Sequence, residues 1–60
     1  MRVWTSTELF RLTRAELLRL DHEMATSTLQ LPESSQERAT ALDNLHRIRR
    51  ELSRRELDPR

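Results

Sequence analysis

The sequence predicts an all-α protein, an antiparallel helical hairpin that assembles as a homodimer resembling a four-helix bundle. Apolar residues recur at helical spacing along most of the chain, and no stretch alternates cleanly between apolar and polar residues as a half-buried strand would. The sequence contains no glycine, the residue that tight β-hairpin turns most often require. With 60 residues, the chain is expected to form one helical domain over residues 1–60.

The small size of the chain predicts self-association. For a domain of this length, the free energy gained by burying apolar surface is about equal to the conformational entropy lost on folding, roughly 90 kcal/mol each. Disulfide bonds supply the missing stability in many small domains, but this sequence contains no cysteine. We therefore expect a second copy of the chain to complete the core as a homo-oligomer.

The hydropathy pattern does not indicate a membrane protein. Apolar runs are no longer than a pair such as Leu17 and Leu18, whereas a transmembrane helix needs about 20 apolar residues. No hydrophobic leader is visible. These observations predict a soluble, cytoplasmic protein without a membrane partner.

The N-terminal half contains two consecutive helix start signals. In each, a glutamate follows a threonine at the spacing of a capping box: the pairs are Thr5 with Glu8 and Thr13 with Glu16. The signals allow one unbroken helix from Thr5, or a short helix over about 5–12 followed by a long helix over about 13–30. On an unbroken helix Leu12 would point away from the apolar stripe, so a short extra N-terminal helix is favoured.

Pro32 separates this region from a second long helix. A residue that precedes proline is pushed out of the helical region, which predicts a turn over 31–34. A capping box at Ser34–Glu37 opens the next helix, expected over about 35–57 and ended by Pro59.

The apolar residues of the two long helices fall into register when the chain folds back at this turn. Leu17 then lies opposite Ile48, Leu20 opposite Leu45, Met24 opposite Ala41, and Thr13 opposite Leu52. Because these layers match without adjustment, the pattern favours an antiparallel hairpin. Asp21 lies beside the stripe, where an unpaired carboxylate is costly to bury, so we expect it to be partly buried with an arginine or hydroxyl partner.

The first long helix carries a second apolar line, about 100° around the helix from the first. Its members are Leu18, Ala25 and Leu29. One partner helix covers only one of the two lines, so this second line, together with Trp4 and Phe10, is the expected oligomer or partner interface.

No constellation of residues indicates catalysis, cofactor binding or metal binding. The lack of cysteine and glycine excludes a thiol nucleophile and a glycine-rich phosphate loop. His22 and His46 are the only histidines, and their spacing does not place two ligands one helical turn apart. We therefore expect no enzyme activity, no cofactor and no metal site.

All eleven basic residues are arginine, a bias that a GC-rich genome also produces. Arg47, Arg50 and Arg54 lie within about 60° of one another on a helical face opposite the apolar stripe, which suits phosphate groups or an acidic partner. Acidic residues at i, i+4 spacing neutralise part of this face: the pairs are Asp43–Arg47, Arg47–Glu51 and Glu51–Arg55. No aromatic residue is interleaved with the arginines to stack on bases.

The sequence resembles a set of short uncharacterised bacterial helical proteins. The resemblance is carried by residues 31–52, LPESSQERATALDNLHRIRREL, and by the opening WTSTELFRLTRAEL. The shared features are the proline-serine-glutamate-arginine turn, an alanine-leucine-asparagine-leucine run, and isoleucine followed by paired arginines. These proteins have no assigned activity, so the resemblance implies a compact helical fold and transfers no functional residue.

Together these features predict a small non-enzymatic protein-interaction or regulatory module, such as an adaptor, an antiactivator or an inhibitor. Such a module would bind an unidentified protein through an oligomeric helical surface. The alternative is a nucleic-acid-binding regulator, either DNA-binding or similar to the ROP hairpin dimer, with the three arginines as contact residues. A purely structural oligomer is a third class that the sequence leaves open.

Overall fold

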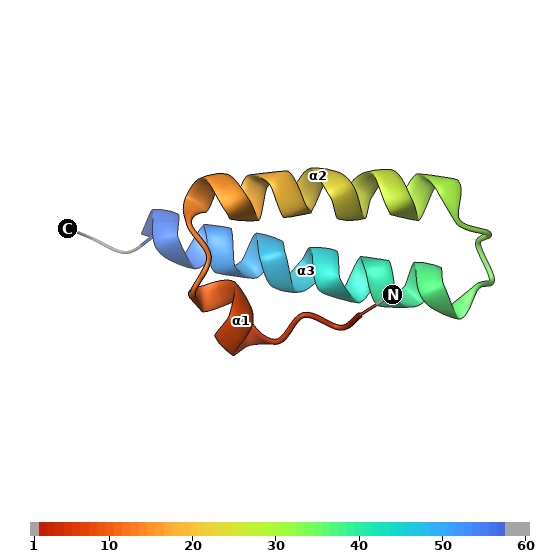
Figure 1. Ribbon diagram of the computed structural model, residues 1–60, viewed down its shortest axis with the longest axis horizontal. Helices are drawn as coiled ribbons and strands as arrows, with labels where there is room; N and C mark the ends of the chain where they lie inside the picture. The colour runs from red at the N-terminus through yellow and green to blue at the C-terminus, as the bar shows by residue number, and fades with distance from the viewer. Residues whose placement is uncertain (1, 58–60) are drawn as a thin grey trace.

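The computed structural model describes residues 2–57, which form helices and no strand. Along the chain these are α1 (Ser6–Phe10), α2 (Arg14–Gln30) and α3 (Gln36–Leu57). The predicted all-α class is therefore confirmed. α2 and α3 lie side by side and run in opposite directions, and α1 lies against the C-terminal half of α3 (Figure 1).

The two capping boxes explain where α1 and α2 begin. The Thr5 hydroxyl accepts a hydrogen bond from the Glu8 backbone N–H at 3.2 Å, and the Glu8 carboxylate accepts one from the Thr5 N–H at 3.0 Å. Thr13 and Glu16 repeat the arrangement at 3.1 and 2.8 Å. Each pair satisfies donors that the first turn of a helix leaves without an intrahelical partner.

The break between α1 and α2, which the sequence favours, is present. Thr13 has an extended backbone with φ −72° and ψ 164° and starts a new helix, so α1 folds back against the hairpin. The break brings Leu9, only 1% exposed, into the core and lets Leu12 pack against it.

The C-terminal end of α2 follows the proline rule. Leu31, which precedes Pro32, has an extended backbone with φ −90° and ψ 148°. Its N–H still donates to the carbonyl of Ser27 at 3.1 Å. The helix therefore ends at the residue that the proline excludes from helical geometry.

The start of α3 differs by one residue from the prediction. The Arg38 N–H donates to the hydroxyl of Ser35 at 3.1 Å, so Ser35 supplies the capping oxygen in place of Ser34. The Ser35 N–H donates to the Pro32 carbonyl at 3.0 Å, which closes the turn just before the helix. With Ser35 as the cap, the third helical position is Arg38. An arginine side chain has no acceptor, so it cannot accept the reciprocal bond from the capping residue's N–H that the predicted capping box assigned to Glu37. At the other end, Pro59 lies outside the described residues.

The hydrophobic core lies where the three helices meet. Its buried members are Leu9, Leu17, Leu20, Met24, Leu45 and Ile48, with Trp4, Leu12, Ala25 and Leu52 packed against them. α1 supplies Leu9, and the predicted stripes of α2 and α3 supply the rest of the buried set. Met24 is therefore a core residue, as expected from its spacing.

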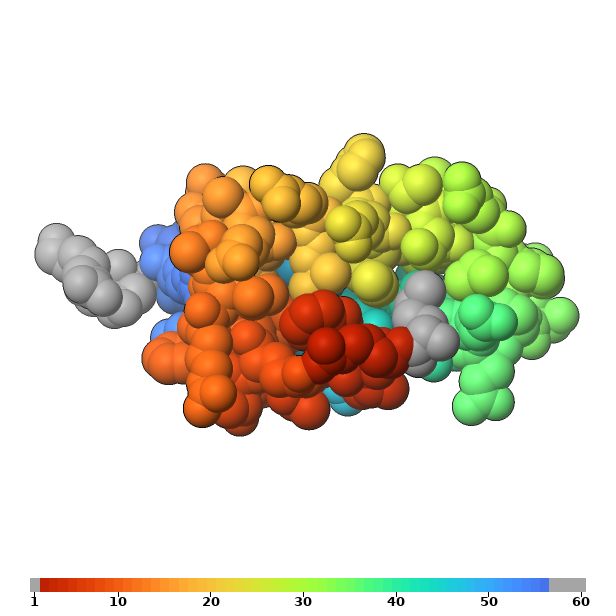
Figure 2. Space-filling model, in the orientation of Figure 1, coloured from red at the N-terminus to blue at the C-terminus, as the bar shows by residue number. Residues whose placement is uncertain are grey.

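Asn44 attaches the N-terminal segment to α3. Its side chain is fully buried; Oδ1 accepts a hydrogen bond from the Trp4 N–H at 2.9 Å, and Nδ2 donates to the Arg2 carbonyl at 2.8 Å. The red N-terminal segment therefore lies across the seam between α2 and α3 on the face shown in Figure 2. The apolar pattern did not predict this contact, because it carries no information on where an extended segment lies.

Asp21 has the environment that the sequence predicts. Its side chain is 23% exposed, and its Oδ2 accepts a hydrogen bond from Arg49 Nε at 3.1 Å. The ion pair joins α2 to α3 at the edge of the core. The expectation of a partly buried Asp21 with an arginine partner is confirmed.

Candidate functional site: the groove between α1 and α3

The three arginines predicted as a contact surface lie along one groove between α1 and α3. The groove has a volume of about 500 Å³, and its lining residues are Ser6, Thr7, Leu9, Phe10, Arg47, Arg50, Glu51 and Arg54. The spacing of the arginines places them on one face of α3, as predicted. This face, opposite the apolar stripe, forms one wall of a groove because α1 folds back beside it.

Arg47 is the groove arginine nearest the N-terminal segment. Its Nη1 forms an ion pair with Asp43 Oδ2 at 3.0 Å and donates to the Trp4 carbonyl at 3.4 Å. The Asp43–Arg47 pair confirms the i, i+4 prediction. Arg47 therefore helps to hold the N-terminal segment as well as lining the groove.

Arg54 is held in a defined orientation by two neighbours. Its Nε donates to Glu51 Oε1 at 3.2 Å, and its Nη2 donates to Glu51 Oε2 at 2.6 Å. The guanidinium carbon also lies 5.4 Å from the centroid of the Phe10 ring, within the range of a cation–π contact. The structure thus places an aromatic ring beside an arginine of the predicted contact surface, which the sequence did not indicate.

Arg50 differs from the other two arginines in its surroundings. Its side chain is exposed, and within residues 2–57 it makes no hydrogen bond, ion pair or ring contact. It lies in the same groove as Phe10 and Arg54. Of the three predicted contact residues, Arg50 is the one whose donors the rest of the described chain leaves available.

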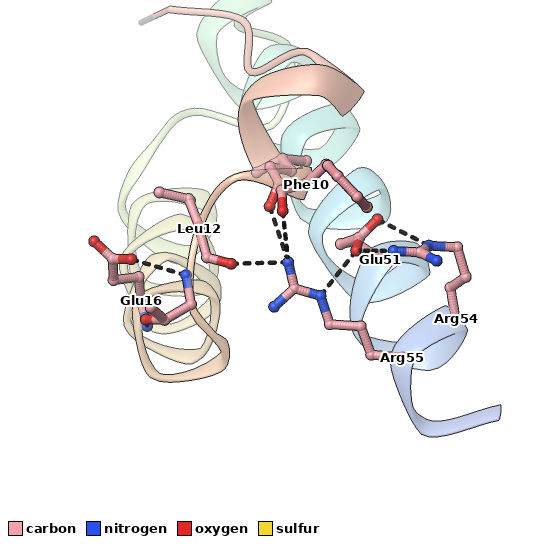
Figure 3. A network of polar contacts seen from close by, with 8 residues as sticks. Phe10, Leu12, Glu16, Glu51, Arg54 and Arg55 are labelled. Atoms are coloured by element: carbon pink, nitrogen blue, oxygen red, sulfur yellow. Dashed lines mark hydrogen bonds and ion pairs between the residues drawn. The ribbon is translucent and has the colours of Figure 1, made fainter. Parts of the chain in front are cut away.

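Glu51 is the acidic residue of the groove, and 11% of its side chain is exposed. Its Oε2 accepts a second bond, from Arg55 Nε at 2.9 Å (Figure 3). The hydrogen bond from Arg54 lowers the pKa of Glu51 below its usual value, and Arg55 adds to the effect, while burial opposes it. The predicted Glu51–Arg55 pair is confirmed; the predicted Arg47–Glu51 ion pair does not form, because Glu51 pairs with Arg54 instead.

Arg55 connects α3 to the C-terminal end of α1. Its Nη2 donates to the carbonyls of Leu9 at 3.3 Å, Phe10 at 3.1 Å and Leu12 at 2.8 Å (Figure 3). The end of a helix leaves carbonyls without intrahelical partners, and a cation is favourable there. The sequence predicts Arg55 only as an ion-pair partner of Glu51, and the position of α1 is what makes it a capping residue as well.

The second apolar line of α2 is divided by the structure. Leu18 and Leu29 are 45% and 86% exposed, whereas Ala25 packs against the core. Leu18 and Leu29 are separated by about 20° around the helix axis, so they share one face. These two residues remain a surface of the kind predicted for an interface.

Trp4 and Phe10 do not extend that surface. Trp4 lies in a shallow hollow of about 180 Å³ with Leu12, Glu16, Arg19, Leu20 and Glu23. Positions 16, 19 and 23 lie about 90–150° around α2 from the direction of Leu18 and Leu29. Phe10, 63% exposed, belongs to the groove instead. The five residues predicted as one interface therefore occupy separate places, because the N-terminal segment crosses the other side of the hairpin.

In the part of the chain that the structure describes, the histidines and acidic residues are not gathered into a metal site. Both histidines are exposed, and within residues 2–57 no group of three or more metal-ligating side chains could hold an ion. No helix in that range combines the length and the apolar character needed to cross a membrane.

Comparison with protein families, with curated proteins and with solved structures finds no match for this chain.

Proposed function

We propose that this chain is a small non-enzymatic interaction module, an adaptor, antiactivator or inhibitor that binds another protein through the groove between α1 and α3. One observation carries the proposal: three arginines of α3 and the exposed ring of Phe10 line a single groove. Arginine and aromatic side chains are enriched among the residues that dominate the energetics of protein interfaces.

The composition of the groove favours a protein over a nucleic acid. Glu51 lies among the arginines, and Asp43 pairs with Arg47, so part of the positive charge is neutralised. A nucleic-acid backbone is instead bound mainly by cations whose counterions are released. Arginine and aromatic residues, which line this groove, are enriched at protein interfaces.

A nucleic-acid-binding regulator is the second candidate function. The position of Phe10 beside Arg54 supports it, because bases stack on aromatic rings and on guanidinium planes. Gel-shift assays with random DNA and RNA at low salt test this candidate. This candidate is supported if the affinity falls steeply between 50 and 200 mM salt. For a surface with several phosphate contacts, the expected fall is roughly 10³-fold or more.

Self-association is proposed for the other exposed apolar surface, the Leu18–Leu29 face of α2. Two copies joined there would form an assembly of the four-helix-bundle type, with the grooves left open. The exposure of these leucines supports the proposal. Size-exclusion chromatography with light scattering tests it, and a single peak at monomer mass at all concentrations contradicts it.

Affinity capture from cells that produce the protein tests the groove as the contact surface. The bait is compared with a double variant, Phe10→Ala with Arg50→Gln, and with Arg19→Gln, which removes one charge elsewhere. A specific partner protein is expected to be lost with the double variant and retained with Arg19→Gln, and nuclease treatment should not release it. Equal capture by all three baits contradicts the proposal.

A further inference from the structure

The occupant of the groove is constrained first by charge. Three of its lining residues are arginines and one is a glutamate, so the lining carries a net positive charge. Arg54 is engaged by Glu51 and Arg47 by Asp43. Arg50 makes no hydrogen bond or ion pair within the described chain, and its planar group presents donors that match a carboxylate.

The occupant is constrained next by the apolar wall of the groove. Phe10, the last residue of α1, is 63% exposed, whereas the preceding residue, Leu9, is buried. Arg55 holds this end of α1 through three carbonyls, so the ring is presented on a supported backbone. An aromatic ring fixed beside a groove offers a surface for an apolar side chain.

Glu51 makes the groove less favourable for a densely charged occupant. Glu51 is ionised near neutral pH, since its two arginine partners stabilise the carboxylate. A chain of successive phosphates would approach this carboxylate and be repelled, whereas a segment with isolated carboxylates can place them at Arg50 and avoid Glu51. Charge complementarity therefore favours a sparsely acidic ligand.

We infer that the groove binds an acidic segment of a partner protein in which a carboxylate pairs with Arg50 and an adjacent apolar side chain packs on Phe10. This inference rests on the proposed function and names the chemistry of the partner. Arg54, positioned by Glu51 and by the Phe10 ring, flanks the same carboxylate.

A panel of four short fluorescein-labelled peptides tests the inference by fluorescence anisotropy with the full chain. The peptides combine aspartate or asparagine with leucine or serine on one backbone. The aspartate–leucine peptide is expected to bind best, and replacing either residue type should weaken binding. Arg50→Gln and Phe10→Ala should each lower the affinity for the aspartate–leucine peptide by about tenfold. This is the effect of losing one charge-assisted contact or one buried apolar contact.

Arg19→Gln is the matched control, because it removes the same charge from an exposed position outside the groove. Circular dichroism establishes that each variant is folded. The inference is overturned if no peptide binds at millimolar concentration, if the asparagine–leucine peptide binds as well, or if Arg19→Gln weakens binding as much as Arg50→Gln. It is also overturned if an oligonucleotide binds more tightly than the peptides and loses binding with Arg50→Gln.

The peptide panel and the capture experiment fail independently. Suppose that a captured protein depends on Phe10 and Arg50 but the chain shows no preference for aspartate peptides. The proposed function is then supported, and the inference that the partner is acidic is contradicted. Loss of groove-dependent capture removes the proposed function itself.

Discussion

Asn44 is the residue on which the attachment of the N-terminal segment depends most. It is a fully buried polar side chain within α3, and both its amide oxygen and its amide nitrogen bond to backbone groups of that segment. A buried polar group is retained at low cost only when its hydrogen bonds are made. Trp4, the only tryptophan in the sequence, lies in the attached segment, so its fluorescence reports whether the attachment is intact.

Asn44→Ala is expected to lower the free energy of unfolding by about 1–3 kcal/mol, because the Trp4 N–H and the Arg2 carbonyl lose their partner. Tryptophan emission of the folded variant should also shift to longer wavelength. Urea unfolding followed by circular dichroism measures the first effect. Glu56→Ala is the control, since it removes only an exposed ion pair with Arg14 and should cost less than about 1 kcal/mol. A variant as stable as the original chain would show that the two bonds contribute nothing net.

Glu51 makes the stability of the folded chain depend on pH. Its pKa in the folded chain lies below the ordinary value of 4.5, first because of Arg54 and then because of Arg55. A carboxyl group with a lowered folded pKa contributes stability that is present above its unfolded pKa and is lost as the pH falls through the folded pKa.

Glu51→Gln should therefore reduce the loss of stability that the chain suffers on going from about pH 7 to about pH 3. Urea midpoints across this range measure the effect, with Glu33→Gln in the exposed loop between α2 and α3 as the control. If the acid dependence is the same with and without Glu51, its ion pairs do not contribute to the stability of the fold.

At the scale of single elements, α1 is the part of the structure that cannot exist alone. It has five residues, and isolated helices shorter than about 12–15 residues are marginal in water. Its capping box satisfies its first turn, Leu9 inserts into the core, and Arg55 satisfies its last carbonyls. α1 also forms one wall of the groove, so the groove depends on these contacts.

Arg55→Lys tests the cap on α1. A lysine keeps the charge but lacks the planar fork that bonds Glu51 and the α1 carbonyls at once. Amide hydrogen exchange in α1 is expected to become about tenfold faster, a change typical of a lost local contact, while exchange in α2 stays nearly unchanged. Arg49→Lys is the control, because Arg49 pairs with Asp21 on α2. Unchanged exchange in α1 would show that Arg55 does not stabilise this helix and that Leu9 and the capping box are sufficient.

At the scale of the whole molecule, the chain is elongated, with extents of 42 × 18 × 16 Å. It exposes 4671 Å² of surface, more than the roughly 4,100 Å² of a compact monomer of the same mass. An elongated shape leaves a thin core relative to the surface, which favours association with a second copy. The exposure of Leu18 and Leu29 marks the face that this copy would cover.

If the chain is a dimer through that face, its thermal midpoint rises with protein concentration. Leu18→Glu combined with Leu29→Glu should abolish the concentration dependence and give a monomer. If the original chain is already a monomer, both positions are exposed to solvent and the same changes alter its stability little. Gln30→Glu, about 110° around α2 from this face, is the control. A concentration-independent midpoint in the original chain would contradict the dimer.

Most of the helical organisation follows from the sequence alone, because its determinants act between neighbours. The capping boxes at Thr5 and Thr13, and the proline after Leu31, act within about four residues. The spacing of apolar residues likewise identified the core of α2 and α3. The one-residue error at Ser34 arose because either of two adjacent serines can cap a helix and only Ser34 is followed by a glutamate three residues later. The turn at Pro32 nevertheless places Ser35 at the start of the helix.

The groove was decided by the tertiary structure. Sequence spacing placed Arg47, Arg50 and Arg54 on one face of a helix, but whether that face is an open ridge or a groove wall depends on the path of the N-terminal segment. Contacts across more than 40 positions, such as Asn44 with Arg2 and Arg55 with Leu9, set that path. They are specified by packing in three dimensions, which local patterns do not encode.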